Sequence, residues 1–242
     1  MLKVIPYILL GHPDLESSYN AIKESLEDTN IDFIELGMPS RNPFKDGETI
    51  QNFQRELISN KFYLDDYFKF IMNYFNKNEI KKFIPMGYLS DIEEFGIKKF
   101  NAELLQIGFR GIICISDENN KNVDKNFQIP QIPVVSQKTI NELKNVYHLK
   151  KPPFIYFVSG NGKTGEVKTH TSEILKNSLE NIRNIVPDVP VYAGFGIDSY
   201  EKAIKMTKSI GFDGVIVGSA LLSNLSKGKK LTDFLKKLRG ER

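Results

Sequence analysis

The sequence predicts an α/β protein of the (β/α)8, or TIM, barrel class, with residues 1–242 forming a single domain. Short runs rich in β-branched and aromatic residues alternate with longer amphipathic segments along the whole chain, which is typical of parallel βα units. Eight such short runs occur within 242 residues, close to the roughly 250 residues of such a barrel. No linker or low-complexity segment divides the chain. A doubly wound open sheet is the alternative, but it usually has fewer strands.

Strands are expected where short apolar runs stand between turn-forming residues. They span residues 3–9, 32–36, 83–86, 111–115, 132–136, 154–159, 189–193 and 214–217. Helices are expected between them; in 15–28, for instance, Ala21, Ile22 and Leu26 fall on one side. They span residues 15–28, 48–58, 63–76, 91–107, 139–147, 171–185, 200–210 and 231–238, with a short extra helix at 220–225.

The bulk composition argues against several classes of function. With 33 basic and 30 acidic residues, the net charge of +3 is too small to predict nucleic-acid binding. The single cysteine, Cys114, allows no intramolecular disulfide, and the three histidines lack metal-ligand spacing, so no metal site is expected. No apolar run approaches the length of a membrane span, and the N-terminal residues lack the pattern of a signal peptide. We therefore expect a cytoplasmic protein without membrane contacts.

Two carboxyl groups give the strongest chemical signal. Glu35 stands inside the apolar run 33–36, and Asp46 lies in the Gly/Pro-rich loop 37–47 that follows. Burial raises the pKa of an unpaired carboxyl, and a fold tolerates this mostly where the acid is used. We expect a raised pKa for Glu35 and an ionised Asp46 in a polar loop, the pair that acid/base chemistry needs. The structural alternatives are a hydrogen-bonded buried acid and an Asp-Gly turn.

The loops after the last two predicted strands indicate a phosphate site. In many barrels these loops bind phosphate through backbone N–H groups and the start of a short extra helix. Gly194, Gly196 and Gly218 would let the backbone approach an anion, and Ser219 could add a hydroxyl group or cap the helix. Ordinary β-to-α turns are the alternative.

The loop after the sixth predicted strand, residues 159–165, contains three glycines, a lysine and a threonine. We expect a lid that closes over substrate, with a disordered surface loop as the alternative. Tyr7, Tyr88 and Tyr156 lie in or next to predicted strands. Each of these tyrosines alone is more typical of a core residue with a polar tip than of a ligand contact.

Several motifs together resemble the tryptophan synthase alpha chain family. The specific one is ELGMPSRNPFKDGETIQ at 35–51, close to the family pattern E-L-G-x-P-x-S-D-P-x-A-D-G-P-x-I-Q. LGHP at 10–13 and YFVSGNGKTG at 156–165 match two further family motifs. GFGI at 194–197 and GSA at 218–220 also match, although they would suit other phosphate-binding barrels. The resemblance covers most of the chain.

The resemblance implies a carbon–carbon lyase that cleaves indole-3-glycerol phosphate to indole and glyceraldehyde 3-phosphate without a metal or organic cofactor. It implies a beta-subunit partner in an α2β2 complex, which receives the indole for tryptophan biosynthesis. By position, Glu35 resembles the acid that protonates the indole carbon, Asp46 the acceptor of the indole N–H, and Tyr156 the tyrosine near the glycerol chain. The implied substrate- and phosphate-binding residues are Tyr7, Met86, Tyr88, Ile113, Thr164, Gly165, Gly194, Phe195, Gly196, Gly218 and Ser219.

The chain departs from the family pattern mainly between and just after the two acids. The segment 40–42 replaces aromatic-Ser-Asp, and Lys45 and Glu48 replace a small residue and a proline. After the fourth strand, Ser116 occupies the register of a family aspartate, and Asp117 follows one residue later. These segments contribute to the beta-subunit interface in the family. We therefore expect the reaction to be retained and the contact surface to be remodelled.

Two other functions remain open at this point. One is another phosphosugar barrel, an isomerase or an enzyme of the indole-glycerol-phosphate synthase type. Such enzymes typically use a lysine or paired aspartates at strand ends, and the chain has no lysine there. The other is a subunit that mainly activates a partner and has little activity alone.

Overall fold

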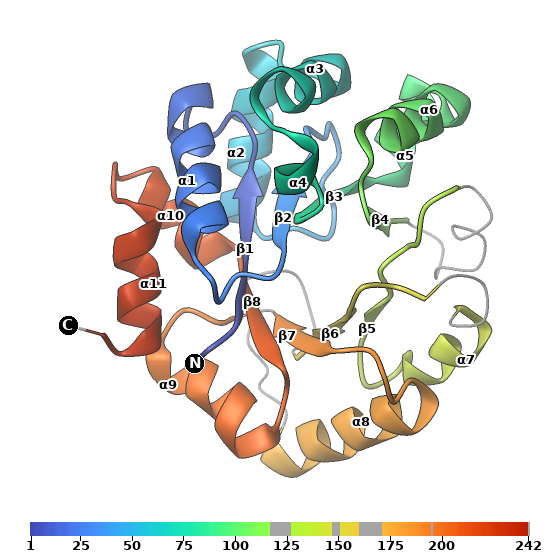
Figure 1. Cartoon of the computed structure of the whole chain (residues 1–242), viewed down its shortest axis with the longest axis vertical. Coiled ribbons are helices and arrows are strands. Elements are labelled where there is room, and N and C mark those ends of the chain that lie inside the picture. Colours follow the sequence, from blue (N-terminus) through green and yellow to red (C-terminus); the bar gives the residue numbers. More distant parts are fainter. Residues whose placement is uncertain (117–126, 147–150, 160–170, 195, 242) are drawn as a thin grey trace.

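Eight parallel strands form one sheet that curls into a nearly closed barrel, with helices around it (Figure 1). The computed structural model describes residues 1–116, 127–146, 151–159, 171–194 and 196–241. The strand order is β4-β3-β2-β1-β8-β7-β6-β5. The strands are β1 (Val4–Leu9), β2 (Ile34–Gly37), β3 (Phe83–Tyr88), β4 (Ile113–Ile115), β5 (Val134–Val135), β6 (Ile155–Val158), β7 (Val191–Gly194) and β8 (Gly214–Val217). The predicted barrel class is thus confirmed.

Among the described residues, one parallel bridge joins the two ends of the sheet. Ile112 pairs with Gln131, just before β4 and β5. The Ile112 N–H donates to the Pro130 carbonyl at 3.0 Å, and its own carbonyl accepts from Ile132 N–H at 2.8 Å. The seam is short because β5 contains only two residues. It brings the loops after all eight strands around one opening, where barrel active sites lie.

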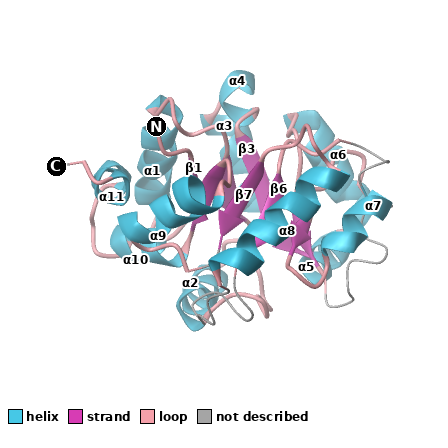
Figure 2. Ribbon diagram, turned by 90° about the horizontal axis from the view of Figure 1, so that it is seen from below, coloured by secondary structure: helices cyan, strands magenta, loops and turns pink. Residues whose placement is uncertain are grey.

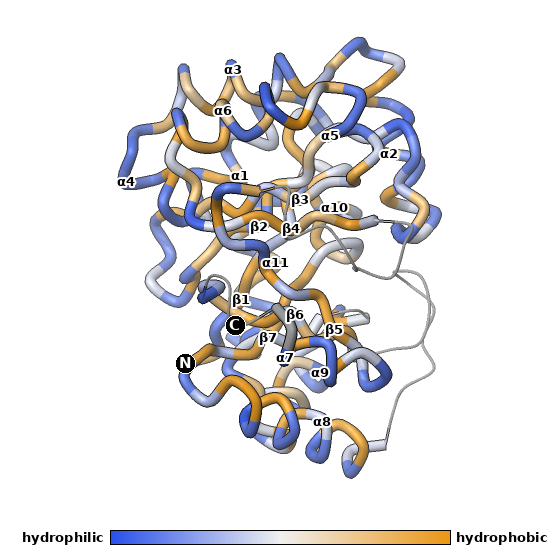
Figure 3. Tube along the Cα trace, turned by 90° about the vertical axis from the view of Figure 1, so that its right-hand side faces the viewer, coloured by the Kyte–Doolittle hydropathy of each residue, from blue (hydrophilic) through white to orange (hydrophobic). Residues whose placement is uncertain are grey.

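Strands β1, β3 and β8 are buried on both faces because helices cover the outside of the sheet (Figure 2). Hydrophobic and hydrophilic residues alternate along helices such as α8, which packs one face on the barrel (Figure 3). The helices are α1 (Leu15–Glu27), α2 (Glu48–Ser59), α3 (Leu64–Tyr74), α4 (Lys77–Ile80), α5 (Leu89–Phe95), α6 (Ile97–Ile107), α7 (Leu143–Val146), α8 (Ser172–Ile185), α9 (Tyr200–Ile204), α10 (Ser219–Leu225) and α11 (Leu231–Arg239).

Three predicted helices differ from the structure. The helix expected over 91–107 is two helices, α5 and α6, because Gly96 adopts a φ of 97°, which a continuing helix cannot contain. The helix expected over 139–147 is a 3-10 turn, η2 (Ile140–Glu142), followed by the short α7. The second half of 200–210 is a π-helix, η3 (Lys205–Ile210). Among the described residues, no helix is long and apolar enough to cross a membrane.

Candidate active site

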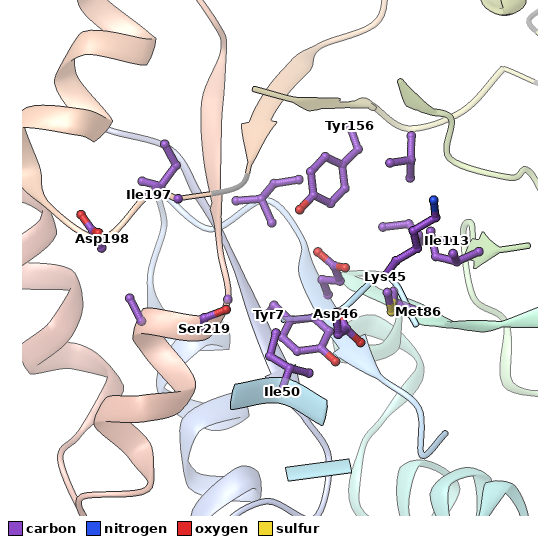
Figure 4. A pocket seen from close by; sticks show the side chains of 17 residues that line it. Tyr7, Lys45, Asp46, Ile50, Met86, Ile113, Tyr156, Ile197, Asp198 and Ser219 are labelled. Carbon is purple, nitrogen blue, oxygen red and sulfur yellow. The ribbon is translucent and has the colours of Figure 1, made fainter. Parts of the chain in front are cut away.

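A cavity of about 200 Å³ opens at the C-terminal ends of the strands (Figure 4). Its wall combines inward-facing strand residues with the loops after β2, β7 and β8. One side is mostly apolar, with Met86 and Ile113 beside Lys45, and the opposite side carries the loop residues Asp198 and Ser219. The lining residues are Tyr7, Glu35, Lys45, Asp46, Ile50, Met86, Ile113, Ile115, Val134, Tyr156, Gly196, Ile197, Asp198, Ile216, Gly218, Ser219 and Ala220.

Glu35 reaches the cavity from the middle of β2. It pairs with Tyr7 of β1 and with Ile84 of β3, and only 2% of it is exposed. Its Oε2 atom has no hydrogen-bond partner among the described residues. Burial raises the pKa of Glu35 to about 8, and the nearby Asp46 carboxylate adds to the rise. Glu35 is therefore a largely protonated acid at neutral pH.

Asp46 is more buried than the sequence predicts, because its loop folds inward over the barrel. It is 5% exposed, which corrects the expectation of a polar loop. Burial raises the pKa of Asp46 to about 6, although a hydrogen bond from the Tyr88 hydroxyl to Asp46 Oδ2, at 2.8 Å, opposes the rise. The Asp46 carbonyl accepts from Gln51 Nε2 at 2.8 Å. Asp46 thus stays mostly ionised at pH 7 while Glu35 does not.

Gln54 anchors the N-terminal part of the loop that carries Asp46. This buried α2 side chain accepts from the Ser40 backbone N–H at 2.8 Å and donates to the Met38 carbonyl at 3.0 Å. Ser40 Oγ also donates to Asp91 Oδ2 of α5 at 2.6 Å. The loop therefore begins from a backbone whose polar groups are satisfied by α2 and α5. This arrangement fixes its direction across the cavity.

Two glycines make room for tyrosine side chains. A Cβ at Gly37 would lie 2.4 Å from the Tyr7 hydroxyl oxygen, and one at Gly194 would lie 2.6 Å from that of Tyr156. Both rings line the cavity. Gly194 itself does not line it; its contribution is the space that Tyr156 occupies. A larger residue at either glycine would displace a ring from the site.

The side expected to hold phosphate combines the loops after β7 and β8. Gly196, Gly218 and Ser219 all line the cavity there, and Gly196 has a φ of 73°. Ser219 is the first residue of α10 and makes no capping bond; its buried Oγ has no partner among the described residues. Asp198 lies on the same side, with its carboxylate paired to Lys202 Nζ at 2.7 Å (Figure 4).

The remaining predicted site residues divide into three groups. Met86 and Ile113 line the apolar side, opposite Ser219. Tyr88 lies behind Asp46 and is not one of the lining residues. Thr164, Gly165, Phe195 and Asp117 fall outside the described residues, as does most of the predicted lid.

Several lining residues were missed by sequence reasoning. Ile115 follows Ile113 by two positions, so the alternation of a strand could have found it. Ile50, Val134, Ile197, Asp198, Ile216 and Ala220 were also missed. So was Lys45, which the sequence pattern assigned to the remodelled contact surface and which the structure places in the cavity wall. In the described part of the chain, no cluster of three His, Cys, Asp or Glu residues could hold a metal ion.

Comparison with known proteins gives a consistent result. The sequence profile of the tryptophan synthase alpha chain family matches residues 2–240. The tryptophan synthase alpha chain of Thermoanaerobacter sp. (strain X514) is 32% identical over 248 aligned residues, covering 98% of this chain and 89% of that protein. That of Pyrococcus furiosus is 30% identical, covering 97% and 94%.

Solved structures agree with this result. Tryptophan synthase subunit alpha from Campylobacter jejuni superposes with a TM-score of 0.78 at 25% identity, covering 98% of this chain and 94% of that chain. The A-subunit from Pyrococcus furiosus gives a TM-score of 0.77 at 25% identity, covering 99% and 100%. The profile match over nearly the whole length and the 32% identity together decide the assignment. The chain belongs to the tryptophan synthase alpha chain family.

Proposed function

We propose that the cavity at the C-terminal end of the barrel is where this chain cleaves indole-3-glycerol phosphate. As a family member, the chain is a carbon–carbon lyase of tryptophan biosynthesis that forms indole and glyceraldehyde 3-phosphate. The single observation that carries the placement of the reaction is Glu35, a buried carboxyl on a barrel strand whose Oε2 atom has no partner among the described residues. A fold keeps such a group where a substrate completes its hydrogen bonding.

The pKa values of the two acids suit opposite roles. With a pKa of about 8, Glu35 holds its proton at pH 7; with a pKa of about 6, Asp46 is mostly ionised. Glu35 gives its proton to the ring carbon that bears the glycerol chain, and Asp46 accepts the ring N–H proton. The ionised Glu35 then takes the proton of the adjacent glycerol hydroxyl, the C–C bond breaks, and Asp46 returns its proton to the ring nitrogen.

The two sides of the cavity suit the two ends of the substrate. Met86, Ile113 and their apolar neighbours offer an indole ring a largely apolar surface beside the two acids. Across the cavity, Gly196, Gly218 and Ser219 offer backbone N–H groups and a hydroxyl to the phosphate. Tyr156 stands between these sides, where the glycerol chain would lie (Figure 4). Thr164 and Gly165 remain proposed lid and phosphate residues on the strength of the resemblance alone.

The alternatives raised by the sequence are not favoured. A different phosphosugar barrel would not be expected to match the alpha chain profile over residues 2–240. Lys45, which lines the cavity, comes from a loop and not from a strand end. A role restricted to activating a partner would not require a cavity containing two carboxyl groups with raised pKa values.

The family works with a beta subunit, and we propose that this chain joins one in a cytoplasmic α2β2 complex. We also propose that the chain functions as one domain. The segment 40–42 would contribute to the contact. Arg41 is exposed there and forms an ion pair with Glu94 of α5, so the remodelled surface has its own internal support.

An indole-release assay tests the proposed reaction. The purified chain, with and without an added beta subunit, should release indole from indole-3-glycerol phosphate, and Glu35→Gln should abolish the release. Asp32→Asn, at the opposite end of the barrel, serves as the matched control and should retain the activity. Absence of release from the wild-type chain under both conditions would contradict the proposal, as would a Glu35→Gln variant with half the wild-type rate.

A further inference from the structure

Tyr7 brings an unpartnered hydroxyl group into the catalytic cavity. The residue is 4% exposed and lines the cavity from β1, and its Oη atom has no hydrogen-bond partner among the described residues. The other fully described buried tyrosines are partnered. The hydroxyl of Tyr67 donates to the Leu36 carbonyl, that of Tyr88 to Asp46, and that of Tyr192 to Asp32. A buried hydroxyl without a partner destabilises a fold. Packing of the ring alone therefore does not explain why the chain has a tyrosine, and not a phenylalanine, at position 7.

The position of this hydroxyl follows from the strand register. Tyr7 and Glu35 are direct partners on the parallel strands β1 and β2, and both side chains line the cavity. Gly37 makes room for the ring tip, because a Cβ there would lie 2.4 Å from Oη. Glu35 also has an unpartnered oxygen, Oε2. Two neighbouring strands thus present two unsatisfied polar groups to the same space.

Two neutral hydroxyl groups that line the cavity interact electrostatically with Glu35, those of Tyr7 and Tyr156, and of the two only that of Tyr7 is buried without a partner among the described residues. Asp46 already accepts from Tyr88, and Asp198 is paired with Lys202. Burial raises the pKa of Tyr7 well above its ordinary value, and the charges of Asp46 and Glu35 raise it further, so the hydroxyl keeps its proton. The titratable groups that face Glu35 or line the same cavity are Tyr7 from β1, Lys45 and Asp46 from the loop after β2, Tyr156 from β6 and Asp198 from the loop after β7. Tyr88 from β3 faces Asp46 instead.

We propose that Tyr7 is a positioning residue for Glu35, whose hydroxyl donates a hydrogen bond to the Glu35 carboxylate once that acid has given its proton to the substrate. The role rests on the proposed lyase function. In this step, the Glu35 O–H bond breaks, a C–H bond forms on the indole ring, and the negative charge stays on the Glu35 carboxylate. Tyr7 keeps its own proton throughout. The hydrogen bond stabilises a charge that otherwise develops in a buried site.

The variant Tyr7→Phe tests the role because it removes one oxygen atom and keeps the ring. Without the donor, ionised Glu35 is less stable, so its pKa rises. We expect the alkaline limb of the kcat/KM profile to move up by about one pH unit. We also expect kcat to fall about tenfold while KM stays within about twofold, because the hydrogen bond forms as the charge develops.

Two other tyrosines provide matched controls. Tyr88→Phe removes the donor to Asp46, so it should raise the acid limb of the profile and leave the alkaline limb in place. Tyr192→Phe removes a buried hydroxyl at the opposite end of the barrel and should move neither limb. If Tyr7→Phe lowers kcat while both limbs stay where they are in the wild type, the hydroxyl acts through packing alone and the proposal is wrong.

An infrared titration separates this inference from the proposed reaction. The C=O stretch of protonated Glu35, assigned by its absence in Glu35→Gln, reports the titration of that acid without any substrate. Tyr7→Phe should raise its midpoint by about one pH unit. A shifted midpoint in a chain that releases no indole would overturn the proposed reaction and leave the Tyr7–Glu35 contact standing. Normal indole release with an unshifted midpoint would overturn the role of Tyr7 alone.

Discussion

The two ends of the barrel treat carboxyl groups in opposite ways. At the C-terminal end, Glu35 has an unpartnered oxygen in the described structure, and burial raises its pKa to about 8. At the N-terminal end, Asp32 Oδ2 accepts from Lys3 Nζ at 2.6 Å and from the Tyr192 hydroxyl at 2.8 Å. Burial alone would raise the pKa of Asp32, but these hydrogen bonds outweigh it and hold the pKa below its ordinary value.

Within one sheet, the groups at the C-terminal end thus serve the proposed reaction, and those at the N-terminal end serve stability. The satisfied charges around Asp32 favour the folded state, whereas the unsatisfied groups around Glu35 oppose it. Tyr192 and Lys3, which donate hydrogen bonds to Asp32, lie on β7 and just before β1. Strands of the same sheet therefore carry residues to both ends of the barrel. Changes at the C-terminal end should therefore affect the rate more than the stability, and changes at the N-terminal end should do the reverse.

The largest effect is expected from Glu35→Gln. The amide cannot give a proton, so kcat should fall by about 10³-fold. The free energy of unfolding should rise in this variant, although kcat falls. The raised pKa of Glu35 means that its contribution is favourable below the unfolded pKa and is lost as the pH rises through about 8. Urea unfolding at pH 5 and pH 8 should show a variant about 1 kcal/mol more stable at pH 5 and about 4 kcal/mol more stable at pH 8. A variant less stable at pH 8 would contradict this view of the site.

Asp46 should produce the next largest loss. Asp46→Asn removes the acceptor of the ring N–H proton and should lower kcat by about 10²-fold. In the wild type, kcat/KM should follow a bell-shaped profile with limbs near pH 6 and pH 8, from Asp46 and Glu35. The acid limb should disappear in Asp46→Asn while the alkaline limb stays. If Asp46→Asn keeps the acid limb, that limb reports the titration of a group other than Asp46.

The sequence was sufficient to predict the barrel and to single out two acids that line its cavity. Eight apolar runs define the strands because strands covered on both faces are continuously hydrophobic, and Glu35 stands out as a charge within such a run. The burial of Asp46 was not predictable, because it depends on Tyr88, 42 residues away along the chain. The interruption at Gly96 was missed because the apolar periodicity continues through it, and only the φ of 97° shows the break.

Gln54 should have a smaller but measurable effect. Gln54→Leu keeps a similar volume and removes both hydrogen bonds to the loop, leaving the Ser40 N–H and the Met38 carbonyl unpaired. We expect a loss of about 2 kcal/mol in the free energy of unfolding and about a tenfold fall in kcat/KM as Asp46 loses its fixed position. Gln106→Leu, on the exposed surface of α6, is the matched control and should change neither quantity. Unchanged kinetics in Gln54→Leu would show that Tyr88 and Gln51 suffice to place Asp46.

The smallest effect is expected at the N-terminal end, from Asp32→Asn. The side chain is about one-third exposed, so solvent screening limits the loss in the free energy of unfolding to about 1 kcal/mol at pH 7. Because the folded pKa of Asp32 is depressed, its stabilisation is present above the unfolded value of about 3.9 and disappears as the pH falls below it. The difference between variant and wild type should therefore close on acidification, whereas the difference for Glu35→Gln opens as the pH rises. Urea unfolding from pH 3 to pH 8 measures both trends, with indole release unchanged in Asp32→Asn; a loss of activity there would mean that the two ends of the barrel are coupled.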